Sequence, residues 1–215
     1  MGTEKKNRLP LITTILVVIN IVVFLISDLL FYKQQDEIAF YMALNPILVL
    51  RGKEYWRLVT SMFYHFGIEH LMCNMLMLYL LGVIVEPFFG RVRFFILYFV
   101  SGLLADMASI IYNGFIIDEN AGVVFCAGAS GAIYGLVGAF VAIFLFLKDK
   151  VPAEERRRFP IAIFFLLFGS IFDTGVGNEA HFGGFIAGVL LGSVYCACMR
   201  MRKRSRTVRK NKLRR

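Results

Sequence analysis

Long runs of apolar residues alternate with short polar runs along most of the chain. Most apolar runs are about 20 residues long, which is the length that a helix needs to cross the hydrocarbon core of a bilayer. The pattern predicts an all-α, polytopic membrane protein built as a bundle of six transmembrane helices. The expected spans are residues 11–31, 66–85, 94–112, 122–147, 160–172 and 181–199, of which the fifth is short.

Polar segments at both ends set the expected domain bounds. Residues 1–10 form a short N-terminal segment, and Pro10 suits the first turn of a helix. Residues 11–199 hold the six spans as one domain, and residues 200–215 form a tail with ten Lys or Arg and no acidic residue. The first apolar run lacks a small-residue cleavage site, so we expect a retained anchor and not a secretory signal.

Composition supports a membrane protein. Hydrophobic residues make up 58% of the chain, whereas a soluble domain has about 45–50%. The net charge of +9 is concentrated in the loops and the tail, which fits a lipid surface and not nucleic acid as the partner. The four cysteines have no spacing typical of a disulfide framework or a zinc site, and we expect no metal and no cofactor.

The distribution of Lys and Arg predicts the orientation. The N-terminal segment, the tail and the loops after spans two and four hold 20 of these residues, and the three loops on the other side hold 4. Because positive charge accumulates on the cytoplasmic side, both termini are expected in the cytoplasm.

With this orientation, spans two, four and six all start at the outer face. His70 and Asn74 lie near the start of span two, Ser130 near the start of span four, and His181 at the start of span six. Polar side chains at membrane depth are costly, so they are candidates for function.

Helix length predicts how deep Ser130 lies. The 18 residues from Ser130 to Leu147 would span roughly 27 Å, slightly less than the hydrocarbon core. Residues 122–129 would then descend to Ser130 as irregular, Gly-containing backbone. Such backbone is tolerated at depth only within protein or beside water, so we expect a water-filled pocket in the outer half of the bundle.

Helical spacing places the candidate residues on faces that can meet. Ser130 and Tyr134 are four residues apart and share a face. Small residues on spans four and six allow these two helices to approach closely, which would bring His181 to Ser130. The alternative is that the glycines serve packing alone. The small-residue faces consist of Gly131, Gly135 and Gly138 on span four, and of Gly184, Gly188 and Gly192, in line with His181, on span six.

His70 and Asn74 are also four residues apart, and both can donate hydrogen bonds. Beside a serine nucleophile they suit an oxyanion hole, with backbone N–H groups at the start of span four. A lone membrane histidine can equally have a structural role, which we favour for His65. The Gly-x-Ser-Gly pattern around Ser130 is weak by itself.

The combination of motifs resembles the rhomboid family of intramembrane serine proteases, in its minimal six-span bacterial form. The resemblance covers nearly the whole chain. It is carried by Gly128-Ala129-Ser130-Gly131 with Tyr134, Ala180-His181-Phe182-Gly183-Gly184 with Gly188, His65-x4-His70-x3-Asn74, Trp56-Arg57, and Gly82-x3-Glu86-x3-Gly90.

The resemblance implies a Ser–His dyad, with Ser130 as nucleophile and His181 as general base. Tyr134 would pack against the His181 ring. The oxyanion would bind His70, Asn74 and the Ser130 N–H. We expect no third, carboxylate member, because Glu179 is two residues from His181 and points elsewhere, and we favour a structural role for Asp106. The supporting residues would be Tyr134, Gly128, Gly131, Gly184 and Gly188.

The resemblance also implies the partners and the compartment. The substrates would be single-pass transmembrane proteins, cleaved in or near the membrane segment. The enzyme would lie in a bacterial inner (plasma) membrane with its active site open to the outer face, and span five with residues 170–178 would gate entry. The sequence leaves the oligomeric state open.

Two other functions compete with this reading. A rhomboid-like protein without activity would bind transmembrane helices for quality control, but such relatives are expected to lack the serine or the histidine. A small transporter would show interrupted helices in repeated halves, and the chain has no such symmetry.

Overall fold

The computed structural model describes residues 10–113, 125–154, 156–157, 160 and 177–212. Within these ranges the protein is helical, and five helices are long and apolar enough to cross a membrane. The prediction of an all-α membrane bundle is therefore confirmed. The predicted fifth span, residues 160–172, and most of the predicted gate lie outside the described residues, so the total of six spans stays a prediction.

The helix bounds differ from the predicted spans, most of all at the end of α9. The long helices are α1 (Leu11–Phe24), α5 (Ile68–Phe89), α6 (Arg91–Ile111), α7 (Ser130–Leu147) and α9 (Asn178–Lys212). A π-helical segment, Leu25–Leu30, extends α1. Pro87 does not end α5, since a proline in the last turn removes only one backbone hydrogen bond.

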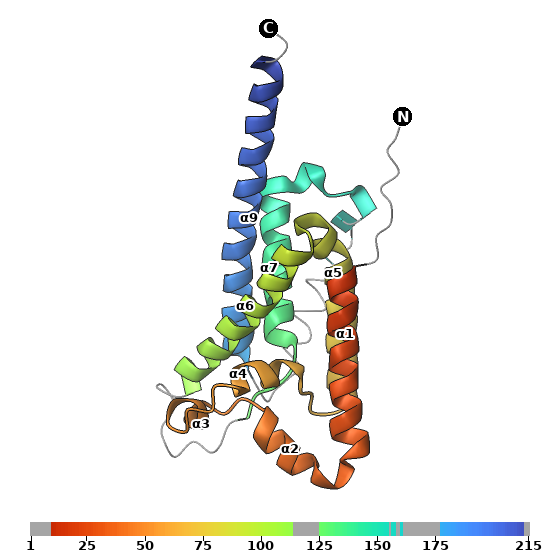
Figure 1. Cartoon of the computed structure of the whole chain (residues 1–215), viewed down its shortest axis with the longest axis vertical. Helices are drawn as coiled ribbons and strands as arrows, with labels where there is room; N and C mark the ends of the chain where they lie inside the picture. Colours follow the sequence, from red (N-terminus) through yellow and green to blue (C-terminus); the bar gives the residue numbers. More distant parts are fainter. Residues whose placement is uncertain (1–9, 114–124, 155, 158–159, 161–176, 213–215) are drawn as a thin grey trace.

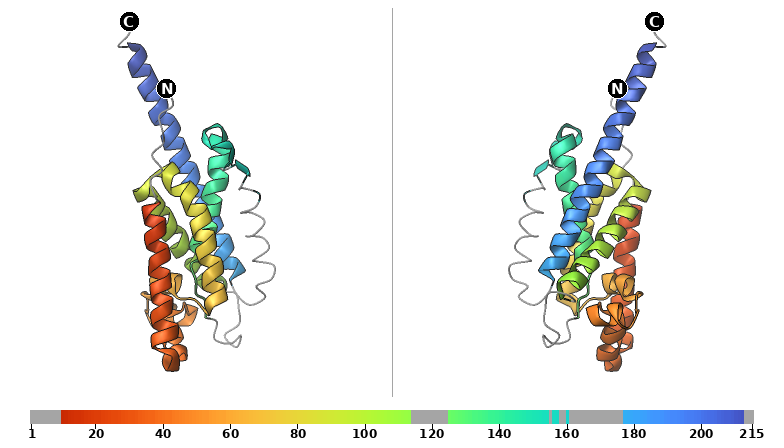
Figure 2. Two further views of the ribbon diagram at one scale, coloured as in Figure 1. Left: turned by 90° about the vertical axis from the view of Figure 1, so that its right-hand side faces the viewer. Right: turned by 90° about the vertical axis from the view of Figure 1, so that its left-hand side faces the viewer.

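The long helices lie side by side: α6, α7 and α9 all pack against one another, α5 packs against α7, and α1 lies beside α5 (Figures 1 and 2). The α7 helix is buried on almost all sides, which explains why its sequence is apolar all round. The starts of α7 and α9 lie at one end of the bundle, near α2–α4. The start of α1 and the end of α9 lie at the opposite end (Figure 1).

Glycines bring the backbones of α7 and α9 into direct contact. A Cβ atom on Gly184 would overlap the carbonyl oxygen of Gly131, and one on Gly188 would overlap that of Gly135. A Cβ atom on Gly138 would in turn overlap the Phe185 carbonyl oxygen. The two helices that carry Ser130 and His181 therefore approach as closely as the small-residue faces allow.

A buried carboxylate joins α1 to α5. Glu86 is 3% exposed and accepts hydrogen bonds from the Ile12 N–H at 3.1 Å and from the Thr13 N–H and hydroxyl, both at 2.8 Å. These N–H groups belong to the first turn of α1, which has no intrahelical acceptors for them. Gly82 leaves room for the Thr13 side chain, because a Cβ atom there would overlap it. The Gly82-x3-Glu86 motif thus fixes the N-terminus of α1.

The segment between α1 and α5 contains several short helices. Short segments with Pro, Gly and few apolar repeats give no clear helical period, so the pattern did not reveal them. They are α2 (Gln35–Met42), α3 (Pro46–Leu50), α4 (Arg57–Thr60) and the 3₁₀ turns Tyr32–Gln34 and Ser61–Phe63.

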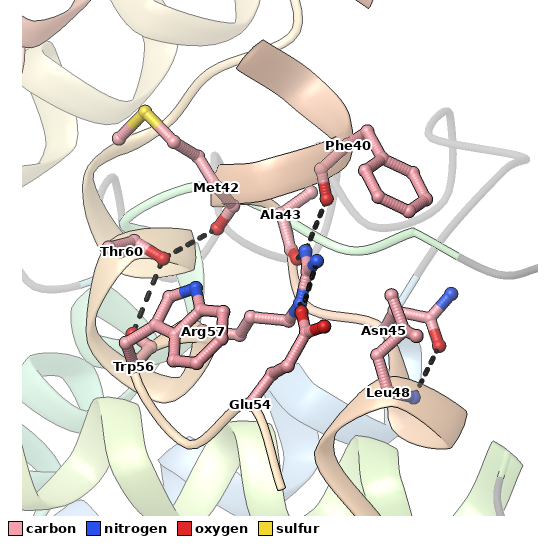
Figure 3. Close-up of polar contacts among 9 residues, drawn as sticks. All are labelled: Phe40, Met42, Ala43, Asn45, Leu48, Glu54, Trp56, Arg57 and Thr60. Carbon is pink, nitrogen blue, oxygen red and sulfur yellow. Dashed lines mark hydrogen bonds and ion pairs between the residues drawn. The ribbon is translucent and has the colours of Figure 1, made fainter. Parts of the chain in front are cut away.

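Arg57 holds this segment together (Figure 3). Its side chain is fully buried, and its guanidinium donates to the Phe40 and Ala43 carbonyl oxygens, the latter at 2.8 Å. It also forms an ion pair with Glu54 at 2.6 Å and lies over the Phe40 ring. Because a buried guanidinium needs such partners, Arg57 fixes the relative positions of α2 and α4.

The α9 helix continues to Lys212 without a break, beyond the predicted end of span six at residue 199. Lys and Arg are good helix formers, so a helix can leave the apolar run without ending. Hydropathy marks where lipid contact stops, not where the helix stops. The start of a separate tail domain at residue 200 stays a prediction.

Candidate active site

Ser130 and His181 meet where α7 and α9 begin. Ser130 is the first residue of α7, and its hydroxyl lies 2.9 Å from His181 Nε2. Tyr134, one turn further along α7, stacks on the imidazole with ring centroids 4.1 Å apart and planes 5° from parallel. This stacking restricts the rotation of the His181 ring and keeps Nε2 directed at the hydroxyl.

The backbone before Ser130 is attached to the segment between α1 and α5. Cys126 forms an antiparallel bridge with Leu44, with hydrogen bonds of 2.8 and 3.0 Å. The Gly128 N–H donates to the Ser61 carbonyl oxygen at 2.8 Å. The short helices α2–α4 and the turn that follows them therefore position the irregular backbone that leads to Ser130.

His65 completes this attachment. Its Nε2 accepts a hydrogen bond from the Ala129 N–H at 3.4 Å, and its Nδ1 lies 3.3 Å from the Phe63 carbonyl oxygen. This arrangement requires the neutral tautomer with the proton on Nδ1. Burial, and the neighbouring His70, lower the pKa of His65 to about 3, so the ring is neutral at physiological pH.

Gly128 packs directly against His70. A Cβ atom on Gly128 would lie 2.8 Å from both Cε1 and Nε2 of the His70 ring, and its φ of +120° is a conformation that side chains disfavour. Only glycine fits this position without displacing the histidine. The ring of His70 contacts that of His65 edge to face, with centroids 5.0 Å apart.

Asn74 is buried one turn after His70 on α5. Its amide nitrogen donates to the His70 carbonyl oxygen at 2.9 Å. One of its two amide hydrogens is thus engaged within its own helix, and the other is left for a second acceptor. The structure places His70 against Gly128, two residues before Ser130, and places Asn74 one turn further along α5.

Two acidic side chains lie behind the Ser–His pair and not in it. Asp106 accepts a hydrogen bond from the Ser61 hydroxyl at 2.9 Å. Glu179 accepts from the Ser109 hydroxyl at 3.3 Å and from the Asn113 amide at 2.8 Å. Sequence reasoning did not single out Ser61, Ser109 or Asn113, because isolated Ser and Asn residues carry no distinguishing pattern.

The arrangement supports nucleophilic chemistry at Ser130. A hydroxyl hydrogen-bonded to a histidine nitrogen can be deprotonated as it attacks a carbonyl carbon. The N-terminal N–H groups of α7 have no intrahelical acceptors and carry the positive end of the helix dipole, which favours a developing negative charge. Within the described residues, no three His, Cys, Asp or Glu side chains gather as metal ligands.

Fold and site together define a multi-pass helical membrane protein with a serine–histidine centre. The Rhomboid domain family model matches residues 52–198, and the chain belongs to the rhomboid family. Membership supports a function of the intramembrane protease type.

Relatives occur in plants and bacteria. The chain is 38% identical to RHOMBOID-like protein 1 and 36% identical to RHOMBOID-like protein 5 of Arabidopsis thaliana, each over 71% of its length. It is 28% identical over 85% of its length to the rhomboid protease GluP of Bacillus subtilis. These matches cover 38%, 47% and 34% of the relatives' own lengths, so the chain corresponds to less than half of each.

Proposed function

We propose that the protein is an intramembrane serine endopeptidase with Ser130 as nucleophile and His181 as general base. The observation that carries the proposal is the 2.9 Å contact between the Ser130 hydroxyl and His181 Nε2, with the ring held by Tyr134. A serine used only for helix packing would need neither a histidine nor a stacked tyrosine at this position.

In the proposed mechanism, the Ser130 hydroxyl attacks the scissile carbonyl carbon and passes its proton to His181 Nε2. The tetrahedral intermediate collapses when His181 returns this proton to the leaving amine, which leaves an acyl group on Ser130. A water molecule then repeats the sequence and releases the acyl product. No cofactor takes part in these steps.

The oxyanion of the intermediate would be stabilised by the Ser130 N–H, the His70 ring and the second amide hydrogen of Asn74. The contact of His70 with Gly128 supports this assignment, because it puts an imidazole beside the backbone that precedes the nucleophile. Gly131, Gly184 and Gly188 support the dyad by keeping α7 and α9 in contact.

The substrates would be single-pass transmembrane proteins cleaved in or near their membrane segment. A peptide in lipid hides its carbonyl groups in helical hydrogen bonds, so the cleaved region must unwind before Ser130 can reach it. The excess of Lys and Arg at the end of the bundle that holds the termini supports cytoplasmic termini and a site near the outer face. We propose a bacterial plasma membrane as the location.

A fluorophosphonate probe tests the dyad directly, because it reacts with activated serines. The purified protein in detergent is expected to be labelled and to cleave a single-pass model substrate. Ser130→Ala should abolish both signals, and His181→Ala should lower the labelling rate by a factor on the order of 10³ or more, since the serine loses its base.

Thermal unfolding of the same samples provides the control. Both variants should melt close to the unsubstituted chain, so that a lost signal reports chemistry and not folding. Cleavage by purified Ser130→Ala at the original rate would refute the proposal. Labelling that is unaffected by His181→Ala would refute the dyad.

A further inference from the structure

Ser109 on α6 lies between the two chain segments that carry the proposed dyad. It is fully buried, and its hydroxyl oxygen lies 3.6 Å from the Cys126 sulfur and 3.3 Å from a carboxylate oxygen of Glu179. Cys126 precedes Ser130 by four residues, and Glu179 precedes His181 by two. One side chain of α6 thus touches both segments.

The hydrogen bonds around Ser109 are mutually consistent. The Cys126 thiol can donate to the Ser109 oxygen. The Asn113 amide also donates to the Ser109 hydroxyl, at 3.1 Å. A hydroxyl has two acceptor sites and one donor, and Ser109 uses the donor for Glu179.

Glu179 attaches the first turn of α9 to the end of α6. Besides the Ser109 hydroxyl, the same carboxylate oxygen accepts from the Asn113 amide at 2.8 Å. Glu179 is the second residue of α9, and the His181 N–H makes one of the first hydrogen bonds of that helix, to the Gly177 carbonyl oxygen. The attachment therefore lies directly beside the residue that must reach Ser130.

The glycine contact between α7 and α9 cannot set this position alone. Small-residue faces let the helices approach, but glycines have no side chains that interlock, so they restrain sliding and rotation less than larger residues would. A carboxylate that binds one donor on α6 and a second just after its end restrains both motions. Because a misplacement of about 1 Å can cost on the order of 100-fold in rate, such a restraint matters at this site.

We propose that Glu179 is a positioning residue, which holds His181 at hydrogen-bonding distance from Ser130 by binding Ser109 of α6 and Asn113, two residues after the end of α6. The inference rests on the proposed function, since it assigns a role in the same reaction. Glu179 does not act as the third member of a triad, because its carboxylate is bound to α6 and not to the imidazole.

Two substitutions of Glu179 test this role in the full chain. Glu179→Gln keeps an oxygen that can accept both hydrogen bonds, and we expect kcat within about threefold of the original. Glu179→Leu removes the acceptor, and kcat for a single-pass model substrate should fall by roughly 10- to 100-fold, with KM changed less than about threefold. The rate of fluorophosphonate labelling should fall in parallel.

Glu69 provides a matched control, because it is also the second residue of a long helix, α5, but its side chain is exposed. Glu69→Leu should leave kcat and KM unchanged. If Glu179→Leu does not fold, the double variant Ser109→Ala, Asn113→Ala removes the same hydrogen bonds from the α6 side and should show the same loss in kcat.

The outcomes separate this inference from the proposed function. If the unsubstituted chain is not labelled, the proposed function fails and the inference fails with it. If the chain is labelled and Glu179→Leu or the double variant reacts equally fast, only the inference fails. A loss in Glu179→Gln as large as in Glu179→Leu would also overturn it, because charge and not hydrogen-bond acceptance would then be the cause.

Discussion

At the residue scale, a neutral imidazole supports the backbone that presents Ser130. His65 accepts a hydrogen bond from the Ala129 N–H and is fully buried. Protonation would abolish this acceptor, because both ring nitrogens of an imidazolium are donors. His65, for which a structural role was expected, thus binds the backbone of the residue directly before the proposed nucleophile.

The low pKa of His65 predicts a pH-dependent stability. The unfolded chain binds a proton at His65 below about pH 6.5, whereas the folded chain does so only near pH 3, so folding is disfavoured as the pH falls between these values. The contribution should be about 2 kcal/mol between pH 7 and pH 5. Melting temperatures of the unsubstituted chain and of His65→Gln, measured across this range, check it.

Gln can accept the Ala129 hydrogen bond but does not titrate. The melting temperature of the unsubstituted chain should therefore fall more steeply on acidification than that of His65→Gln. Parallel curves for the two proteins would show that His65 is not the responsible group.

At the scale of elements, the contact between α7 and α9 is the interface on which the site depends. At the glycines it is built from backbone atoms, since Gly131, Gly135, Gly184 and Gly188 have no side chains to separate the helices. Helices in lipid gain no hydrophobic free energy by associating, so van der Waals contact at short range has to stabilise them. This type of contact tolerates no added atoms.

Gly188→Ala is expected to separate the two helices. The added Cβ atom would overlap the Gly135 backbone, which cannot move aside as a flexible side chain could. We expect a loss of about 1–3 kcal/mol in stability and slower fluorophosphonate labelling. Thermal unfolding and labelling rates check both effects.

Leu190→Ala is the control for this substitution. Leu190 lies on the same helix but is 62% exposed on the protein surface, so its truncation removes no helix contact of this kind. Equal stability of Gly188→Ala and the unsubstituted chain would contradict the role assigned to the close contact.

At the scale of the whole molecule, the bundle has two chemically different ends. The site lies toward the end that also holds α2–α4, and the start of α1 and the end of α9 lie at the other (Figure 1). Ten Lys or Arg residues follow residue 199, and eight of them lie on α9, which continues to Lys212. Charge and architecture together make the orientation testable.

Single cysteines report this orientation in intact bacterial cells. Lys53→Cys lies on the exposed segment before α4, and a membrane-impermeant maleimide should label it from outside. Lys203→Cys should be labelled only after the cells are permeabilised. Labelling is counted above that of the unsubstituted chain, which has four cysteines of its own. The reverse pattern would show that the termini face outward.

Much of the architecture follows from patterns that are local in sequence. Long apolar runs mark membrane-spanning helices, and i, i+4 spacing puts Ser130 and Tyr134 on one face. Glycine stripes indicated which faces of α7 and α9 meet, because small residues at helical spacing have few other uses in lipid. The start of α7 at Ser130 also agrees with the helix-length argument.

Other features depend on contacts between distant residues and have no periodic signal. Hydrogen bonds join Gly128 to Ser61, Ala129 to His65, and Ser109 to Glu179. The residues in these pairs are 64 to 70 positions apart in the sequence. Each involves a common polar residue or a backbone group, so composition and spacing do not distinguish it from a solvated one.

Hydropathy, charge and helical spacing thus specify the class of protein, its expected orientation and the faces of its helices. Tertiary structure alone decides the separation of Ser130 and His181, the attachment of the Gly128 backbone to the α1–α5 segment, and the contact of Glu179 with Ser109 of α6. The physical reason is that lipid selects apolar residues along each helix independently, whereas a buried polar group is satisfied only by a partner that folding brings to it.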